Sequence, residues 1–268
     1  EIKDVPALRD VQVMCKLLES LGATVDPELD ENNVDITAGS VLTYEAPYEL
    51  VKMMRASILV LGALLLRTGR AVIPLPCGCA ICKRPVELHL KGLKALGATI
   101  DEERLARGIV DAKADKLKGT TIYLDFPSVG ATEVIIMAAS LAEGTTILEN
   151  AAQEPEIVDL ANFLNKMGAR IKGVGTDTIK IEGVEKLKGV SHHVITDRIE
   201  AGTFMVGAVM TKGNVLIKNV VPDHLKAVIA KLRECGADIT MTDEGLVARG
   251  DVNPIVSTDV KTLPYPGF

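Results

Sequence analysis

The sequence predicts an α/β fold that is built from repeated modules, and three observations support this prediction. First, a Gly-Ala step closes an amphipathic stretch about every 70 residues, at Gly22, Gly97, Gly168 and Gly236. Second, another set of glycines follows apolar stretches, at Gly69, Gly144 and Gly213. Third, short runs rich in β-branched residues, 120–124 and 178–181, lie between these glycines and are typical of strands.

Each glycine of the first set is expected to end a helix and open a strand, because glycine adopts the left-handed conformation at little cost. Each glycine of the second set is expected to separate an apolar helix from a strand. These predicted helices are 50–66, 132–141 and 202–210, and the strands that follow them are 71–73, 146–148 and 214–217. One module is therefore expected to run strand–helix–strand–strand–helix–strand, or a cyclic shift of this order.

Helices that are apolar on nearly all sides, such as 56–66, need to be buried on two faces. Modules arranged around a shared axis would bury them in this way. The expected fold is therefore several small α/β modules packed together rather than a solenoid of helix pairs.

Composition excludes several classes of protein. The 268 residues are 47% hydrophobic and only 3% aromatic, so an aliphatic core is expected. A net charge of −6 argues against general nucleic-acid binding, which needs a basic face. The longest apolar run, 58–66, is too short to span a membrane. No secretory signal or disulfide framework is visible, so a cytoplasmic location is expected, and both chain ends look cut.

Three of the five cysteines lie in the short segment 77–82 and are followed directly by Lys83 and Arg84. Nearby cations stabilise a thiolate, which is the reactive form of cysteine. The neighbouring proline and glycine indicate a loop, where reactive groups are often found. Cys79 is therefore predicted to be a reactive thiol, and an inert buried thiol is the alternative.

Cys77, Cys79 and Cys82 also have the spacing of metal ligands. A closed tetrahedral site would need a fourth ligand, for which Cys15, Cys235 and His89 are the candidates. The preferred interpretation is that Cys77 and Cys82 are tolerated substitutions in a loop and that no metal is bound.

Three further groups of residues are candidates for a binding site. Arg55 lies at the head of an apolar helix and needs a partner, either a ligand or a carboxylate. Ser128 is expected to cap a helix whose first residues, Val129 and Gly130, offer N–H groups to an anion. Asp197 and Glu200 fit either a helix cap or a site. His192 and His193 are expected at the surface, and His224 is expected to be structural.

Several of these motifs together resemble the UDP-N-acetylglucosamine enolpyruvyl transferases. The matching stretches, which cover the chain, are 54–58, 79–81, 84–86, 128–132, 149–152, 154–159 and 197–200. The resemblance implies an inside-out α/β barrel of βαβαββ modules in two domains, with three modules in each. Residues 1–195 would form the first domain without its opening strand, and 196–268 would begin a truncated second domain.

The resemblance also implies a reaction. The enolpyruvyl group of phosphoenolpyruvate is transferred to the 3-hydroxyl of UDP-N-acetylglucosamine, phosphate is released, and peptidoglycan synthesis begins. Cys79 would donate a proton to C3 and form a covalent adduct with phosphoenolpyruvate, and it would be the target of fosfomycin. No metal or organic cofactor and no protein partner are implied, and the protein is expected to be a monomer.

Site roles follow from the same resemblance. Arg55 and Arg84 would hold anionic oxygens of the substrates. Asp197 and Glu200 would face the cleft between the domains. The segment that lines the uridine pocket comprises Arg84, Pro85, Val86, Glu87 and Leu88. The helix start that holds the diphosphate comprises Ser128, Val129 and Gly130.

The chain departs from the family pattern at four positions. Cys77 and Cys82 replace loop glycines, Glu87 replaces the aspartate that is frequent in the family, and Phe126 stands where some relatives have lysine. The family's Lys-Asn pair and Pro-Thr-Asp run would precede Glu1 and follow Phe268, so poor turnover is expected of the chain alone. Three alternatives remain: a UDP-sugar-binding fragment or paralogue, the sister enzymes acting on shikimate 3-phosphate, which lack the cysteine loop, and a thiol or metal module.

Overall fold

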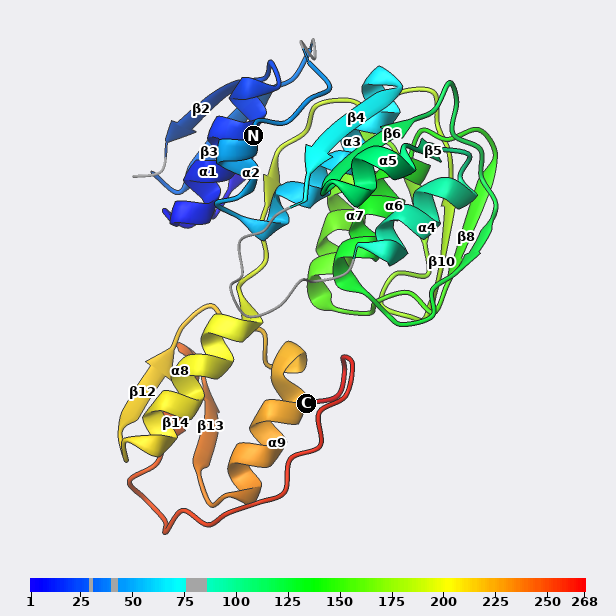
Figure 1. The fold of residues 1–268 in the computed structure, drawn as a ribbon. Coiled ribbons are helices and arrows are strands. Elements are labelled where there is room, and N and C mark those ends of the chain that lie inside the picture. The colour runs from blue at the N-terminus through cyan, green and yellow to red at the C-terminus, as the bar shows by residue number, and fades with distance from the viewer. Residues whose placement is uncertain (29–30, 40–42, 76–85) are drawn as a thin grey trace. The chain divides into compact units, whose positions relative to one another are not determined.

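The computed structural model describes residues 1–28, 31–39, 43–75 and 86–268. The chain divides into two compact units, residues 1–194 and 195–268, and each unit has its own core. Figure 1 shows the first unit from blue to yellow and the second from yellow to red. Within the described residues, no helix is long and apolar enough to cross a membrane.

The third module of the first unit shows the repeating pattern most clearly. Its elements in chain order are β7 (Thr121–Tyr123), α6 (Val129–Ala139), β8 (Thr145–Glu149), α7 (Pro155–Met167), β9 (Arg170–Lys172) and β10 (Thr178–Glu182). The sheet order is β7-β8-β10-β9, with β7 parallel to β8 and the other neighbours antiparallel. The order is βαβαββ, which the resemblance implied and which is confirmed. The order expected from the glycine spacing, strand–helix–strand–strand–helix–strand or a cyclic shift of it, is wrong.

The second module repeats this arrangement around the sheet β4-β6-β5. Its elements are α2 (Tyr48–Val51), the 3-10 helix η2 (Arg55–Leu59), α3 (Val60–Thr68), β4 (Arg70–Pro74), α4 (Glu87–Ala95), β5 (Thr99–Ile100), α5 (Glu102–Ala106) and β6 (Ile109–Lys113). A single parallel bridge between Glu45 and Val72 takes the place that β7 has in the third module.

The sheet of the first module is completed by a strand from the end of the unit. Its elements are β1 (Ile2–Lys3), α1 (Arg9–Ser20), β2 (Thr24–Glu28) and β3 (Asn33–Thr37), in the sheet β11-β1-β3-β2. The parallel edge strand β11 (His192–His193) comes from the opposite end of the unit, and Ile2 pairs with His192. The first and last strands of the unit therefore pair with each other in the same sheet.

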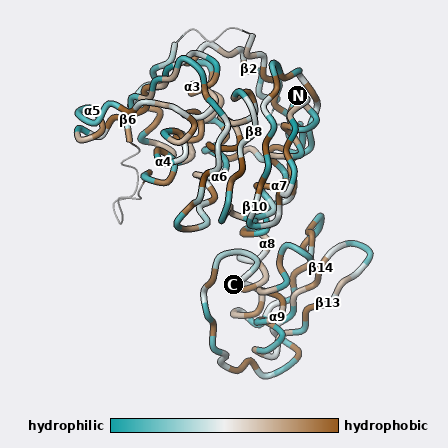
Figure 2. The backbone as a smooth tube through the Cα atoms, turned by 90° about the vertical axis from the view of Figure 1, so that its right-hand side faces the viewer, coloured by the Kyte–Doolittle hydropathy of each residue, from teal (hydrophilic) through white to brown (hydrophobic). Residues whose placement is uncertain are grey.

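Helices α3 and α6 form the interior of the first unit. They pack against each other, and α6 also contacts α4 and α7. In α6 the buried side chains lie on all sides of the helix, as expected for a helix covered on two faces. Figure 2 shows hydrophobic stretches alternating with hydrophilic loops along this unit. The predicted burial of apolar helices in the centre of the modules is confirmed.

The glycines of the first set have the predicted conformation. Gly22, Gly97, Gly168 and Gly236 follow helices at φ values of 105°, 101°, 108° and 99°. In the second set Gly69 and Gly144 are also left-handed, at 72° and 87°. At the third position, however, Lys212 adopts φ 54° in place of Gly213. The turn after α8 is therefore made one residue earlier than predicted.

The predicted helix 50–66 is wrong, because the segment is broken. Met54 has extended backbone angles (φ −148°, ψ 127°), which end the short helix α2 and start η2. The continuous apolar helix begins only at Val60. Hydrophobicity alone did not reveal this break, because Met53 and Met54 fit a helix pattern equally well.

His192 was expected at the surface and is instead buried, with 4% of its surface exposed. Its Nε2 lies 3.1 Å from Asp159 Oδ1 and its Nδ1 lies 3.3 Å from Lys166 Nζ. His193, the next residue along the strand, is exposed as predicted and pairs with Asp4. Successive side chains of a strand point to opposite faces, so only one of the two histidines can lie at the surface.

The second unit has its own three-stranded sheet. Its elements are α8 (Arg198–Met210), β12 (Asn214–Ile217), the 3-10 helix η3 (Pro222–Leu225), α9 (Lys226–Glu234), β13 (Asp238–Thr242) and β14 (Gly245–Arg249). The sheet order is β12-β14-β13 and both pairings are antiparallel. Its core is small and formed by α8, α9 and one face of the sheet.

The close packing of α3 on α6 leads to a stability prediction. A Cβ added at Gly62 would lie 2.6 Å from the carbonyl oxygen of Val134, a backbone atom that cannot rotate away. Gly62→Ala is therefore expected to lower the free energy of unfolding by about 1–3 kcal/mol, measured by denaturant unfolding. Gly207→Ala in α8 is the control, because nothing lies within 4 Å of its added Cβ. Equal effects of the two substitutions would contradict this packing argument.

Candidate functional site

Three helix starts in the first unit meet around one buried histidine, His89. This residue lies in the first turn of α4, and its Nε2 is 2.9 Å from the position of a Cβ added at Gly130 in α6. The start of η2 contributes Arg55, whose charge acts on His89. The structure therefore brings together three groups of residues that were predicted separately.

The first group is the start of α4. Val86 occupies the N-cap position, Glu87 is exposed in the first turn, and Leu88 packs partly against the core. This arrangement leaves the outer side of the turn accessible, while Leu90 and Leu93 anchor the helix in the interior. A role of these residues in a uridine pocket stays a prediction.

The second group is the start of α6. Ser128 caps the helix as predicted, and its Oγ accepts a hydrogen bond from Ala131 N at 3.4 Å. The N–H of Thr132 donates to the carbonyl of Ser128 at 2.9 Å. The N–H groups of Val129 and Gly130 precede this first helical bond and have no backbone partner among the described residues. Free N–H groups at a helix start attract anions, and anion binding here stays a prediction.

Arg55 begins the 3-10 helix η2 and is exposed, directly after the extended residue Met54. Arg55 therefore lies where the helical backbone is interrupted, and not at the start of a long helix. A cation at the surface beside the starts of α4 and α6 is suited to contact a bound anion.

His89 is electrically neutral at physiological pH. Only 3% of its surface is exposed, and this burial lowers the pKa of His89 to about 4, with the nearby charge of Arg55 acting in the same direction. Its Nδ1 makes no hydrogen bond to a described residue. From the sequence, His89 was a candidate only as a metal ligand. A histidine between apolar residues of an amphipathic helix was the signal that could have placed it in the interior.

The cysteine loop lies outside the described residues. This applies to Cys79, Arg84 and Pro85, and also to Cys77 and Cys82. Among the described residues, no group of His, Cys, Asp or Glu side chains is arranged to hold a metal ion. Cys15 lies in a small apolar cluster with valines, and this burial raises the pKa of its thiol.

Asp197 and Glu200 lie at the start of α8 in the second unit. Asp197 Oδ1 accepts hydrogen bonds from the N–H groups of Ile199 at 2.7 Å and Glu200 at 3.1 Å, so Asp197 is a helix cap. Glu200 is exposed in the first helical turn. The capping role is confirmed, and a role of either residue in a site stays a prediction.

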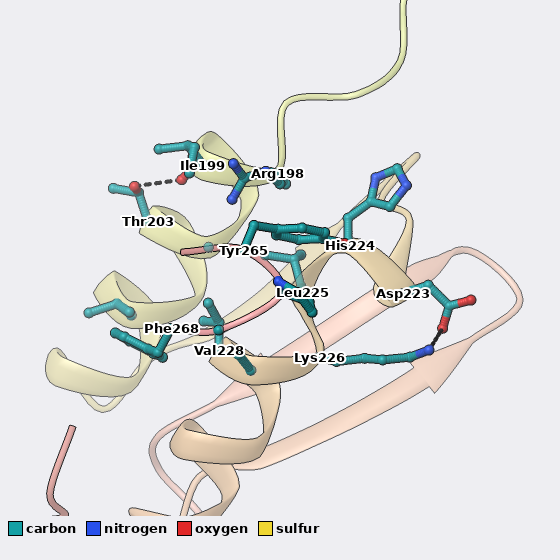
Figure 3. Close-up of a pocket in the computed structure, with 15 residues that line it drawn as sticks. Arg198, Ile199, Thr203, Asp223, His224, Leu225, Lys226, Val228, Tyr265 and Phe268 are labelled. Carbon is teal, nitrogen blue, oxygen red and sulfur yellow. Dashed lines mark hydrogen bonds and ion pairs between the residues drawn. The ribbon is translucent and has the colours of Figure 1, made fainter. Parts of the chain in front are cut away.

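The second unit has a pocket of about 420 Å³ between α8, η3, the start of α9 and the segment 265–268. Its walls are mainly apolar, and Figure 3 shows Arg198 beside the ring of Tyr265, with 5.1 Å between the guanidinium carbon and the ring centroid. The sequence did not predict this pocket, because its walls come from segments that are far apart in the chain.

An acidic group lies where α6 meets α7. Glu133 is in the second turn of α6, and burial raises its pKa to about 7, with the charges of Glu156 and Glu154 adding to the effect. Because the folded protein holds this proton more tightly than the unfolded chain, the stability that this group contributes is present below about pH 4.5 and is lost as the pH rises through 7.

Glu133→Gln is therefore expected to raise the free energy of unfolding at pH 8 by about 2 kcal/mol, because the amide cannot ionise. Urea unfolding at pH 4, 6 and 8 measures the effect, which should shrink towards pH 4. Glu103→Gln, at an exposed position of α5, is the matched control. A gain for Glu133→Gln that is the same at all three pH values would contradict the assignment.

Comparison with known proteins places this geometry in a family. The family model described as EPSP synthase (3-phosphoshikimate 1-carboxyvinyltransferase) matches residues 1–268. The chain belongs to the EPSP synthase family.

Two solved structures of enolpyruvyl transferases share the fold. Their sequence identity to this chain is low, so they are informative about the fold alone. The enolpyruvyl transferase NikO from Streptomyces tendae has a TM-score of 0.79 at 23% identity, covering 92% of this chain and 59% of NikO. EPSP synthase from Acinetobacter baumannii has a TM-score of 0.67 at 22% identity, covering 93% and 58%.

Curated relatives within the family are more similar in sequence. A protein named UDP-N-acetylglucosamine 1-carboxyvinyltransferase 1 from Caldanaerobacter subterraneus is 59% identical over 267 residues. Proteins with this enzyme name from Carboxydothermus hydrogenoformans and Staphylococcus aureus are 57% and 52% identical over 271 residues. In each case the match covers 100% of this chain and 63% of the relative. The predicted α/β fold class and the predicted resemblance are both confirmed.

Proposed function

We propose that this protein transfers the enolpyruvyl group of phosphoenolpyruvate to the 3-hydroxyl of UDP-N-acetylglucosamine and releases phosphate. The observation that carries this proposal is the identity of 52–59% to relatives named for this reaction, over the whole chain. The chain spans 63% of the length of those relatives, so the proposal concerns the protein expressed from its complete gene.

The geometry of the first unit supports a site for an anionic nucleotide. The start of α6 offers N–H groups to a diphosphate, and Arg55 adds a positive charge beside them. The partly buried Val86 and Leu88 at the start of α4 provide apolar contacts suited to a uracil ring. These groups would bind the nucleotide through hydrogen bonds, charge and apolar contacts, and none of them would need to gain or lose a proton.

The chemical step is assigned to Cys79, with Arg84 holding anionic oxygens of the substrates. The sugar 3-hydroxyl loses its proton to a base as its oxygen bonds to C2 of phosphoenolpyruvate, while the thiol of Cys79 gives its proton to C3. The thiolate then takes a proton back from C3, the C2=C3 double bond forms again, and the C2–O bond to phosphate breaks, which leaves the enol ether and free phosphate. Closure of the protein over both substrates would exclude water during these steps.

A second acceptor is favoured by one observation, because the matching family model is described by a 3-phosphoshikimate 1-carboxyvinyltransferase. The deciding experiment measures phosphate release from phosphoenolpyruvate by the complete protein with each acceptor. We expect release with UDP-N-acetylglucosamine and none above background with shikimate 3-phosphate. Release with shikimate 3-phosphate alone would overturn the proposed acceptor, and binding of the nucleotide sugar without release would favour the binding fragment or paralogue.

We further propose that the protein acts in the cytoplasm at the first committed step of peptidoglycan synthesis, as a monomer and a target of fosfomycin. Mass spectrometry of the protein treated with fosfomycin tests the thiol assignment. The adduct is expected on Cys79, and an adduct confined to Cys77 or Cys82 would contradict it.

A further inference from the structure

We propose that His89 is a positioning residue of the diphosphate site. Its imidazole packs against Gly130 and so keeps the N–H groups in the first turn of α6 where a nucleoside diphosphate can accept hydrogen bonds from them. This inference rests on the proposed function for the identity of the ligand. It concerns a residue for which neither the motifs nor the relatives' names supply a role.

The contact between His89 and Gly130 is close. An added Cβ at Gly130 would lie 2.9 Å from Nε2 of His89, with the neighbouring ring carbon at 3.6 Å. Real Cβ atoms almost never make contacts this short, so the imidazole fills the space that a side chain at position 130 would need. The position of the α6 backbone at Gly130 is thus set by the ring of His89.

The part of α6 that this contact fixes is the part with free donors. The cap of Ser128 satisfies Ala131, while the N–H groups of Val129 and Gly130 find no backbone partner among the described residues. A shift of a few tenths of an ångström at Gly130 would move these N–H groups away from phosphate oxygens. The contact of His89 with Gly130 therefore affects binding of the diphosphate more than it affects binding of the uridine part.

The surroundings of His89 suit a positioning role. The side chain is 3% exposed, so it is enclosed by the protein. Its imidazole interacts with the backbone of Val86 at the start of α4 and with the charge of Arg55, while its Nε2 faces Gly130. His89 therefore links the starts of α4 and α6 beside Arg55.

Binding of UDP and of uridine to the complete protein, measured by titration calorimetry, tests the inference without requiring turnover. His89→Leu is expected to weaken UDP binding about tenfold or more and to change uridine binding less than threefold. In steady-state assays, KM for UDP-N-acetylglucosamine should rise while kcat changes little. Gly130→Ala, which pushes on the same contact from the other side, is expected to have the same selective effect. His89→Gln, which keeps a polar group, should restore part of the UDP affinity.

His193→Leu is the matched control, because this histidine is exposed on β11, and it is expected to bind UDP like the unmodified protein. Thermal unfolding of every variant identifies any loss of the fold, and Gly130→Ala supplies the test if His89→Leu does not fold. Unchanged UDP affinity in His89→Leu or Gly130→Ala, or an equal loss of UDP and uridine, would overturn the inference. If the unmodified protein binds UDP but releases no phosphate, the proposed reaction fails while the role of His89 is still decided.

Discussion

Replacing Cys79 by alanine in the complete protein is expected to lower the rate of the proposed enolpyruvyl transfer by about 10²- to 10⁴-fold. This is the usual contribution of a positioned general acid, and alanine has no proton to give to C3 of phosphoenolpyruvate. The measurement is phosphate release at saturating concentrations of both substrates, so that the loss is read in kcat. Binding of UDP should be retained, because its proposed contacts lie at the starts of α4 and α6.

Cys77→Ala and Cys82→Ala are the controls for this substitution. They remove neighbouring thiols from the same loop and are expected to keep kcat within about tenfold of the unmodified protein, well above the loss from a missing general acid. Undiminished turnover in Cys79→Ala would disprove the assignment of the acid. A comparable loss in all three variants would show that the loop needs its thiols for another reason, such as a metal site.

Replacing Asp111 by alanine is expected to cause the largest loss of stability, about 3 kcal/mol or more. Asp111 lies on β6 with 1% of its surface exposed and accepts hydrogen bonds from Arg70 Nε at 3.0 Å, Arg70 Nη2 at 2.7 Å and Arg104 Nη1 at 2.7 Å. Its carboxylate therefore ties β4, β6 and α5 together. Removing it leaves two partly buried guanidinium groups without their shared partner.

The same contacts determine how the stability depends on pH. The hydrogen bonds from Arg70, joined by that from Arg104, hold the pKa of Asp111 below its usual value. The stabilisation is therefore present above about pH 4 and is lost as the pH falls further. Urea unfolding at pH 7 and pH 3 should show a larger difference between the unmodified protein and Asp111→Ala at pH 7 than at pH 3. Glu143→Ala, which breaks the exposed pair with Lys116, is the control and should change the stability little at either pH, because exposed ion pairs contribute little.

The fold was predictable where a local rule decides the structure. A glycine after an amphipathic stretch must take the left-handed conformation for the chain to turn, and Gly97 and Gly168 do so. The caps at Ser128 and Asp197 are equally local. The break at Met54 was missed because no sequence rule forbids a helix there, and the burial of His192 depends on Asp159 and Lys166 from another element.

The candidate site was predictable in its parts and not in its arrangement. Arg55 and Ser128 were each singled out by a local pattern, yet nothing in the sequence indicates that both lie near His89. That proximity comes from the packing of η2 and α4 against α6, which depends on contacts between residues far apart in the chain. The importance of His89 therefore became visible only when its contact with Gly130 was known.

The pairing of β1 with β11 has a consequence for biosynthesis. Ile2 on β1 pairs with His192 on β11, far along the chain, so this pairing cannot form until nearly the whole first unit has emerged from the ribosome. Such closure over a long sequence distance slows folding. Until β11 is made, the edge of β1 that pairs with it lacks this strand, and a chaperone that covers exposed strands would help the first module most at this stage.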